Sequence, residues 1–388
     1  MADYDRELSK IVAELNRAAP SQKAAVRAPE SSASLEELLH FAVRRGASDV
    51  LLIAGAPLIL RINGALAPVS GSLGAGVALE PEDVRATMLP LLEPEQLEEL
   101  QKRKSLDFGF EREGLGRFRI NLHHQRGTLA ASIRLLPSRI PSLESLHLPA
   151  SLARLAESRQ GLVLVTGPTG CGKTSTLAAL VDLINTRRAA HVVTIEDPIE
   201  YQHANRGAVI EQIEVGRDTP DFSGTLRSIM RQTPDVILVG EMRDPETIAT
   251  VLTAAETGHL VLSTLHTNDT IQAVGRILDS FPTANQPQIR QQVSLAMLAV
   301  LAQQLVPGID GTTRWPAVEI MIATDAVRAL IRKGDDHQLR SQIAVGRAEG
   351  MLTMEQSLAD LVRSGHITRD TAFAHCFRAD DLKRYLLD

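Results

Sequence analysis

The chain has very little cysteine and few aromatic residues. Cys171 and Cys376 are its two cysteines in 388 residues, so neither a disulfide framework nor a cysteine-based zinc site is supported. Aromatic residues make up 3% of the chain and hydrophobic residues 44%, so its cores must depend on aliphatic side chains. The scarcity of cysteine favours a reducing, cytoplasmic setting.

Long apolar runs are also missing. No run approaches the roughly 18 to 20 residues needed to cross a bilayer. The N-terminal stretch MADYDRELSKIVAELNRAAP carries charges where a signal peptide needs an apolar core. We therefore expect no direct membrane insertion, and we expect any membrane association to come through partners.

An excess of positive charge is absent too. Lys and Arg total 41 against 47 for Asp and Glu, which gives a net charge of −6. A mildly acidic chain is a poor candidate for coating nucleic acid, although a local basic groove is compatible with this charge. We expect no nucleic acid among its partners.

The length of 388 residues favours two or three domains. Residues 1–34 are predicted to be a short amphipathic helix and a linker rich in Ala, Ser and Pro. Residues 35–140 mix helical and strand-like runs, such as ELLHFAVRRG, DVLLIAG and GRFRINLHHQ. They predict an α+β domain with an antiparallel sheet. Residues 141–160, which begin with the Pro- and Ser-containing IPSLESLHLP, are interpreted as an interdomain linker.

The pattern changes at Gly161. The buried-type strands GLVLVTG, HVVTIED, DVILVGE and HLVLSTLHT alternate with helical stretches over 161–284. Such alternation predicts a largely parallel sheet covered on both faces, which is an α/β core. Residues 285–388 are predicted to be wholly helical and to complete the same domain.

A complete phosphate-binding motif lies at the first strand of this core. The segment GPTGCGKT at 167–174 matches G-x-x-x-x-G-K-[ST] and lies between a strand and a helix, which is the context that the motif requires. Its backbone amides and the helix N-terminus would surround phosphate oxygens. The predicted ATP-binding residues are Gly167, Pro168, Thr169, Gly170, Cys171, Gly172, Lys173, Thr174 and Ser175. Lys173 would reach the β- and γ-phosphates, Thr174 would offer its hydroxyl to Mg²⁺, and Cys171 is interpreted as an inert small filler.

Acidic residues follow two other strands. Glu241 ends DVILVGE, next to the expected phosphates, and we predict that it binds Mg²⁺ through water. Glu196, Asp197 and Glu200 follow another strand, where a carboxylate can position the attacking water. Glu200 is the preferred candidate, although the sequence does not rank the three.

Two histidines flank a further strand. His259 precedes HLVLSTLHT's apolar run and His266 follows it, and both are candidates for sensing or orienting groups near the γ-phosphate. A structural role for each is the alternative. A zinc pair is disfavoured because no third or fourth ligand is nearby in sequence.

Four segments of the core resemble, in this order, the Walker A, aspartate-box, Walker B and histidine-box motifs of the secretion ATPase superfamily. They are VTGPTGCGKT, TIEDPIEY, RQTPDVILVGEMRDPETI and AAETGHLVLSTLHTND. The resemblance is strongest to the PilT-type retraction motors of type IV pili, and it covers roughly 35–375. It implies a RecA-like P-loop ATPase core, a smaller PAS-like α+β N-terminal domain and C-terminal helices.

The resemblance also implies a homo-hexamer with ATP bound between the two domains. It assigns Glu200 as catalytic glutamate, Glu241 as the Walker B acid, and His259 and His266 as the histidine-box residues. Arg119 and Arg134, in RFRIN and ASIRLL, match the trans-acting arginines of the family's N-terminal domain. An arginine delivered to a transferring phosphoryl group contributes about 10³–10⁵ in rate. Arg117 and Arg126 are close to them in sequence and could be confused with them.

The implied activity is ATP hydrolysis coupled to pilus retraction and twitching motility. The implied partners are an inner-membrane platform protein of the pilus and related motor ATPases, at the cytoplasmic base of the pilus machine. Assembly and secretion relatives usually carry an extra N-terminal domain and a four-cysteine zinc motif, which this sequence lacks, so retraction is favoured. The family motif Asn-Leu-Ile-Arg-Glu-Gly is ALIRKG at 329–334 here, with Ala329 and Lys333 as the departures.

Three alternatives stay open. A nucleic-acid motor of the same RecA-like build is disfavoured by the acidic charge and the few aromatic residues available for base stacking. An assembly or secretion ATPase of the same superfamily is the second. A regulatory partner that binds ATP without cycling it is the third, and the presence of the catalytic carboxylates argues against it.

Overall fold

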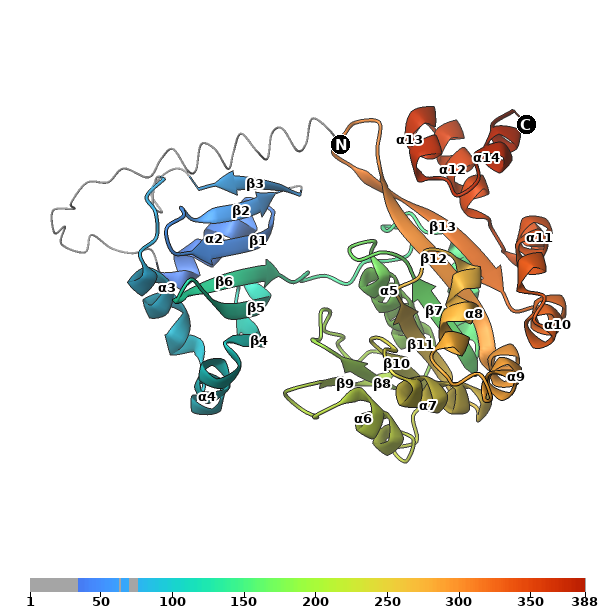
Figure 1. Cartoon of the computed structure of the whole chain (residues 1–388), viewed down its shortest axis with the longest axis horizontal. Helices are drawn as coiled ribbons and strands as arrows, with labels where there is room; N and C mark the ends of the chain where they lie inside the picture. Colours follow the sequence, from blue (N-terminus) through green and yellow to red (C-terminus); the bar gives the residue numbers. More distant parts are fainter. Residues whose placement is uncertain (1–33, 63, 70–75, 388) are drawn as a thin grey trace.

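The computed structural model describes residues 34–62, 64–69 and 76–387. These residues form two sheets, each with its own hydrophobic core, which are joined by an extended segment (Figure 1). The amphipathic helix predicted for 1–34 lies, except for Ser34, outside the described residues. No helix among the described residues combines the length and the apolar character needed to span a bilayer.

The N-terminal sheet is antiparallel, as predicted, with the strand order β3-β2-β1-β6-β5-β4. Its strands are β1 (Ala47–Ile53), β2 (Ile59–Ile62), β3 (Ala65–Pro68), β4 (Ser105–Arg112), β5 (Gly116–Gln125) and β6 (Thr128–Leu135). Its helices are α2 (Leu35–Arg44), α3 (Pro81–Met88), the 3₁₀ turn η1 (Leu89–Leu91) and α4 (Pro94–Arg103). Ser34 and Glu37 cap α2 reciprocally, which satisfies backbone donors at the helix start.

The second sheet is the α/β core, with the order β13-β12-β7-β11-β10-β8-β9. Its strands are β7 (Gly161–Thr166), β8 (His191–Glu196), β9 (Val209–Glu214), β10 (Val236–Val239), β11 (Leu260–Leu265), β12 (Met297–Pro307) and β13 (Arg314–Ile322). All neighbours are parallel except β12 and β13, which pair antiparallel. The four strands predicted over 161–284 are confirmed, whereas β9 was not predicted.

Helices cover both faces of this sheet because successive strand residues are buried on opposite sides. Leu162 and Leu164 face one cluster, and Val163 and Val165 face the other. The second face is covered by α5 (Lys173–Arg187) and by the 3₁₀ segment η2 (Ala150–Glu157). The first face is covered by α6 (Phe222–Ile229), α7 (Pro245–Glu256), α8 (Thr270–Asp279) and α9 (Gln286–Ala296).

The prediction that 285–388 is wholly helical is wrong. The stretch MLAVLAQQLVP forms strand β12, which pairs with β7 on one side and with β13 on the other. A short Ala- and Leu-rich run does not by itself distinguish a buried strand from a buried helix, and pairing with the sheet decides in favour of the strand. Helices do follow: α10 (Asp325–Lys333), η3 (Asp336–Gln338), α11 (Leu339–Val345), η4 (Gly346–Glu349), α12 (Met354–Arg363), α13 (Arg369–His375) and α14 (Ala379–Leu387).

The predicted linker 141–160 is only partly extended. Leu152 and Leu155 of η2 are buried in the core cluster together with α5 residues. Upstream, the ring of Trp315 lies between His147, at 4.3 Å between ring centroids, and His366, at 3.6 Å. The second half of the predicted linker therefore packs against the ATPase core, and an extended connection between the two sheets is confined to the residues before η2. The domain boundaries themselves stay a prediction.

Candidate functional site

A cleft of about 550 Å³ lies where the loops at the carboxyl ends of β7, β8, β10 and β11 face strands β5 and β6 of the N-terminal sheet. Both domains contribute side chains to its walls. The lining residues named in the sequence analysis are Arg119, Arg134, Thr169, Gly170, Gly172, Lys173, Thr174, Ser175, Glu196, Asp197, Glu200, Glu241 and His266. One cleft thus unites the P-loop, the acidic residues and the arginines.

The P-loop needs its glycines for space as well as for conformation. Gly167 has φ 141°, and a Cβ there would lie 2.1 Å from the Gln303 carbonyl oxygen and 2.7 Å from Cys171 Sγ. Gly172 has φ 93°, and a Cβ there would lie 2.9 Å from Gln303 Nε2. Side chains rarely tolerate such conformations and contacts. Cys171 is buried, and this burial raises the pKa of its thiol, which agrees with an inert packing role.

Lys173 begins helix α5 and folds back over the loop. Its Nζ donates hydrogen bonds to the carbonyl oxygens of Gly167 at 2.9 Å and Pro168 at 3.1 Å. Its side chain is buried, and desolvation lowers the pKa of its ammonium while the nearby Glu241 raises it. A desolvated ammonium that donates to carbonyl oxygens would strongly attract an anion at this place.

The three acids after β8 occupy different environments. Glu196 is buried and accepts hydrogen bonds from Thr194 Oγ1 at 2.7 Å and Gln212 Nε2 at 3.1 Å. Burial raises the pKa of its carboxyl to about 7. Glu200 is half-buried and Asp197 is exposed, and all three line the cleft. The geometry places the three together without ranking them.

Glu241 follows β10 and lies beside the P-loop lysine. Its carboxylate pairs with Arg243 at 2.6 Å and lies 3.9 Å from His266 Nε2. Desolvation lowers the pKa of His266, and the charge of Lys173 adds to that shift. The carboxylate therefore lies among three groups that carry or can carry positive charge.

His259 is not at the cleft, so the expectation that it lies near the γ-phosphate edge is wrong. It precedes β11, and its carbonyl oxygen accepts from Gly161 N at the start of β7. Its Nδ1 lies 3.0 Å from the Ala254 carbonyl oxygen at the end of α7. The P-loop follows the other end of β7. Because β7 and β11 run parallel, His259 and His266 lie at opposite edges of the sheet.

Arg119 and Arg134 are cross-strand neighbours on β5 and β6, and both line the cleft. Arg119 pairs with Asp107 at 3.6 Å, and Arg134 pairs with Asp49 at 3.0 Å. The expectation was that such arginines act in trans. This stays a prediction; within a single chain, both arginines line the cleft that contains its own P-loop. Arg126 is exposed at a hairpin turn and does not line the cleft.

Sequence reasoning missed two residues that shape the site. Gln303 of β12 is buried, donates from Nε2 to the Cys171 carbonyl oxygen at 2.6 Å, and accepts from Thr176 Oγ1 at 2.8 Å. Tyr201 places its hydroxyl 2.8 Å from Ser175 Oγ. A polar residue inside the apolar run AVLAQQLV was the available signal for Gln303, and the helical interpretation of that run concealed it.

Magnesium requires oxygen ligands, and the cleft offers them. Thr174 supplies a hydroxyl and Glu241 a carboxylate, a donor set that fits Mg²⁺ held largely by water and phosphate. Among the described residues, no group of three or more His, Cys, Asp or Glu is arranged to hold a metal ion. The residues therefore fit a metal that arrives with a nucleotide rather than one caged by protein alone.

Known proteins resemble this chain along most of its length. It is similar to the Type IV pilus ATPase PilU of Pseudomonas aeruginosa, with 39% identity over 348 residues that cover 90% of each chain. It is similar to the Type IV pilus retractation ATPase PilT of the same organism, with 41% identity over 338 residues, which are 87% of this chain and 96% of that one.

A solved structure of the pilus retraction motor PilT with bound ADP has a TM-score of 0.83 and 40% identity, and it covers 91% of this chain and 99% of its own. This likeness confirms the predicted fold class. A family model described as Type II/IV secretion system protein matches residues 128–372. The chain therefore belongs to the Type II/IV secretion system protein family, as a nucleotide-binding ATPase of the PilT and PilU type.

Proposed function

We propose that this ATPase powers the retraction of type IV pili and thereby twitching motility. The observation that carries the proposal is the cleft that joins the P-loop to arginines of the N-terminal sheet, in a chain that covers 99% of a pilus retraction motor at a TM-score of 0.83. A site built from two domains changes shape when they move. Nucleotide turnover in it is thereby linked to displacement.

In the proposed reaction, ATP enters the cleft and Lys173 exchanges its carbonyl partners for phosphate oxygens. Thr174 and Glu241 would hold Mg²⁺, which neutralises phosphate charge when it is bound. Glu200 would position a water for attack on the γ-phosphate. Arg119 and Arg134 would leave their aspartate partners and stabilise the charge of the transferring phosphoryl group.

The setting of this reaction is also a proposal. A homo-hexamer would arrange the clefts in a ring, so that their opening in turn displaces a partner at its centre. The partners would be an inner-membrane platform protein of the pilus and related motor ATPases, and the ring would work at the cytoplasmic base of the machine. The family membership and the names of the similar proteins support this setting.

The first test is ATP turnover by the purified chain. Lys173→Ala removes the phosphate-binding ammonium and is expected to abolish turnover. Glu200→Gln should lower kcat by about 10²-fold or more while ATP still binds. Removal of divalent cations with EDTA should stop turnover, and added Mg²⁺ should restore it. Wild-type rates in either variant would end the role given to that residue.

The direction of work is tested in the native host. Deletion of the gene is expected to leave cells with excess surface pili and without twitching motility, because retraction has stopped while assembly continues. Cells without pili would instead indicate an assembly ATPase. Complementation with the Lys173→Ala variant separates loss of ATP turnover from loss of the protein.

A second candidate is a motor that works beside a sibling, because the chain is 39% identical to a PilU and 41% identical to a PilT. Ala329 and Lys333, the two departures from the family motif, lie on α10. Full complementation of a host that lacks both of its own retraction ATPases would favour an independent motor. Complementation that needs the sibling would favour the second candidate.

A further inference from the structure

Arg117 of β5 spans the interface between the N-terminal sheet and the ATPase core. Its Nη1 donates a hydrogen bond to the Ile199 carbonyl oxygen at 2.8 Å, and its Nη2 lies 3.6 Å from Glu214 Oε2. The Arg117 side chain is 12% exposed and that of Glu214 is 7% exposed. Removal of Arg117 would leave the Glu214 carboxylate desolvated and without this partner, which is costly for a nearly buried charge.

The carbonyl that Arg117 contacts belongs to the peptide bond that leads into Glu200. The amide of the same residue, Ile199 N, donates to Glu214 Oε2 at 3.0 Å. Both polar groups of the Ile199 backbone are thus fixed by one arginine and one glutamate. These contacts therefore fix the backbone directly before Glu200, the preferred catalytic residue.

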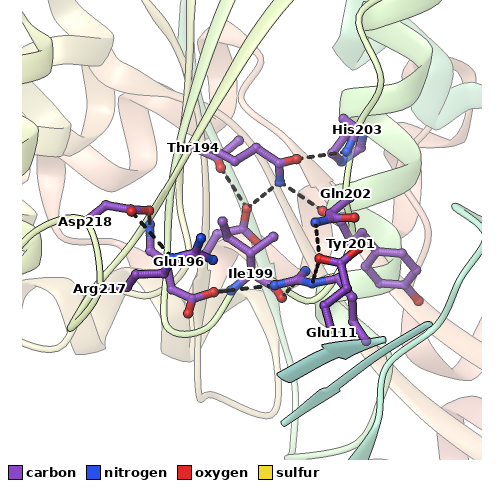
Figure 2. Close-up of polar contacts among 12 residues, drawn as sticks. Glu111, Thr194, Glu196, Ile199, Tyr201, Gln202, His203, Arg217 and Asp218 are labelled. Atoms are coloured by element: carbon purple, nitrogen blue, oxygen red, sulfur yellow. Dashed lines mark hydrogen bonds and ion pairs between the residues drawn. The ribbon is translucent and has the colours of Figure 1, made fainter. Parts of the chain in front are cut away.

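Strand β9 supports the same loop from the core side. Gln212 Nε2 donates to the Tyr201 carbonyl oxygen at 2.9 Å, and Gln212 Oε1 accepts from His203 N at 2.8 Å. Figure 2 shows these contacts together with Glu111 of the N-terminal sheet, which accepts from Gln202 Nε2 at 3.4 Å. The loop is therefore held by β9 on one side and by β4 and β5 on the other.

The geometry of β5 ties this contact to the cleft. Residues two apart on a strand lie on the same face, so Arg117 and Arg119 share a face while Phe118 between them is buried in the N-terminal core. Arg119 lines the nucleotide cleft, and Arg117 contacts the loop that carries Glu200. On β4, a Cβ on Gly109 would lie 3.5 Å from Glu214 Oε1, so the two sheets approach closely at this point.

We propose that Arg117, through Glu214 and the Ile199 carbonyl, is a positioning residue that sets the place of Glu200 according to the position of the N-terminal domain. Arg119 and Glu200 then reach their catalytic positions together, because strand β5 carries Arg119 and, through Arg117, also holds the loop that contains Glu200. When the domains separate, the loop loses its support and hydrolysis is switched off. The inference rests on the proposed ATPase function of the cleft.

The test compares Arg117→Gln, Glu214→Gln and the double variant with the wild-type full-length chain. Arg117→Gln is expected to lower kcat by about 10- to 100-fold, since small misplacements of a catalytic group have effects of this order. ATP affinity, measured by equilibrium titration, should change by less than about twofold because no phosphate contact is lost. The double variant should be no slower than Arg117→Gln alone, because Arg117→Gln already breaks the ion pair that Glu214→Gln removes, and a glutamine oxygen can still accept from Ile199 N.

Arg117→Lys should recover part of kcat, because a lysine can still donate to the Ile199 carbonyl oxygen. Arg103→Gln is the matched control: it removes an exposed arginine of the same domain that pairs with Glu99 on its own helix, and its kcat should equal the wild-type value. Thermal unfolding of each variant checks that the fold is kept. Unchanged kcat in Arg117→Gln, or single effects that multiply in the double variant, would overturn the proposal.

A second readout does not depend on turnover. Hydrogen–deuterium exchange of the loop 197–203 should be faster in Arg117→Gln than in the wild type, whereas the control should leave it unchanged. If the wild type failed to hydrolyse ATP, the proposed function would fail while this measurement still decided whether Arg117 holds the loop. Exchange equal to the wild-type rate would show that it does not.

Discussion

Glu196 is buried at the end of β8, and its burial sets a pH dependence of stability. The pKa of its carboxyl rises from 4.5 to about 7, so the folded chain keeps this proton between those values while the unfolded chain releases it. The contribution of this carboxyl to the free energy of unfolding is therefore fully present below pH 4.5, falls as the pH rises, and stays at its reduced value above pH 7. The loss is on the order of 3 kcal/mol.

Glu196→Gln isolates this contribution, since glutamine has no proton to lose and its carbonyl oxygen can accept from Thr194. The free energy of unfolding, measured with denaturant at a series of pH values, should fall less with rising pH in the variant than in the wild type. Parallel curves for the two proteins would contradict the assignment. Asp197→Asn, which changes an exposed acid next to it, is the control and should follow the wild type.

Gln303 holds the P-loop from strand β12, so its removal should loosen the nucleotide site. Gln303→Ala removes the side-chain donor to the Cys171 carbonyl oxygen, at a cost of about 1–3 kcal/mol for a buried polar group. The Thr176 hydroxyl loses Gln303 but keeps the Gly172 carbonyl oxygen. We expect lower stability together with weaker ATP binding, measured by denaturation and by equilibrium titration.

Gln304 provides the matched control because it is the adjacent residue and contacts His375 instead of the P-loop. Gln304→Ala should lower stability and leave ATP affinity unchanged. Equal losses of affinity in both variants would mean that Gln303 acts through general stability and not through the loop.

Residues inside motifs could be predicted from the sequence, because each motif fixes spacing and neighbouring elements together. Lys173, Thr174, Glu200, Glu241 and His266 all lie on one cleft, as the order of motifs predicted. His259 was misplaced because it precedes its strand, whereas in a parallel sheet the carboxyl ends of the strands meet the phosphates, so it lies at the opposite end. Gln303 was missed because its role depends on the β12–β7 pairing, which is remote in sequence.

At the scale of elements, the junction between β7 and α5 is limited by space. Gly167 and Gly170 both have positive φ, at 141° and 78°. Only the first would place a Cβ against backbone, 2.1 Å from the Gln303 carbonyl oxygen, whereas a Cβ at Gly170 meets nothing within 4 Å. Gly167→Ala should therefore abolish ATP binding or folding, since it adds a clash with backbone to the strain that alanine meets at positive φ.

Gly170→Ala should be milder, with a cost of about 1–3 kcal/mol from conformational strain alone. Denaturation curves and ATP titrations of the two variants provide the comparison. Similar behaviour would mean that strain, and not the contact with β12, makes glycine necessary at 167.

Hairpin β12–β13 illustrates why elements beyond the motifs were harder to predict. Parallel strands buried on both faces appear as continuous apolar runs, and those of β7, β8, β10 and β11 were recognised beside their motifs. The run that forms β12 has no motif, and its Ala and Leu residues have high helix propensity. Pairing with β7 and β13 overrides that propensity, because pairing satisfies backbone groups that burial would otherwise leave without partners.

At the scale of the whole molecule, the two sheets had to be predicted separately, because no sequence pattern states how they face each other. The antiparallel N-terminal sheet followed from short strand-like runs, and the parallel core followed from the alternation of strands and helices. Their contact, which places Arg119 and Arg134 in the cleft of the P-loop of the same chain, depends on the linker and on side chains such as Arg117 that meet the core only in the folded chain.

This arrangement leads to a mixing prediction. Arg119→Ala and Lys173→Ala are each expected to be inactive as separate proteins. If each cleft uses the arginine of its own chain, mixed assemblies of the two contain no complete site, and ATP turnover stays absent. If a neighbouring chain supplied the arginine, some sites would combine an intact P-loop with an intact Arg119, and mixing would restore part of the activity. Steady-state ATP turnover across a series of mixing ratios therefore distinguishes the two.

Co-purification of differently tagged variants must first establish that they assemble together. A mixture of wild type with Lys173→Ala then calibrates the ATP turnover expected from active sites within mixed assemblies.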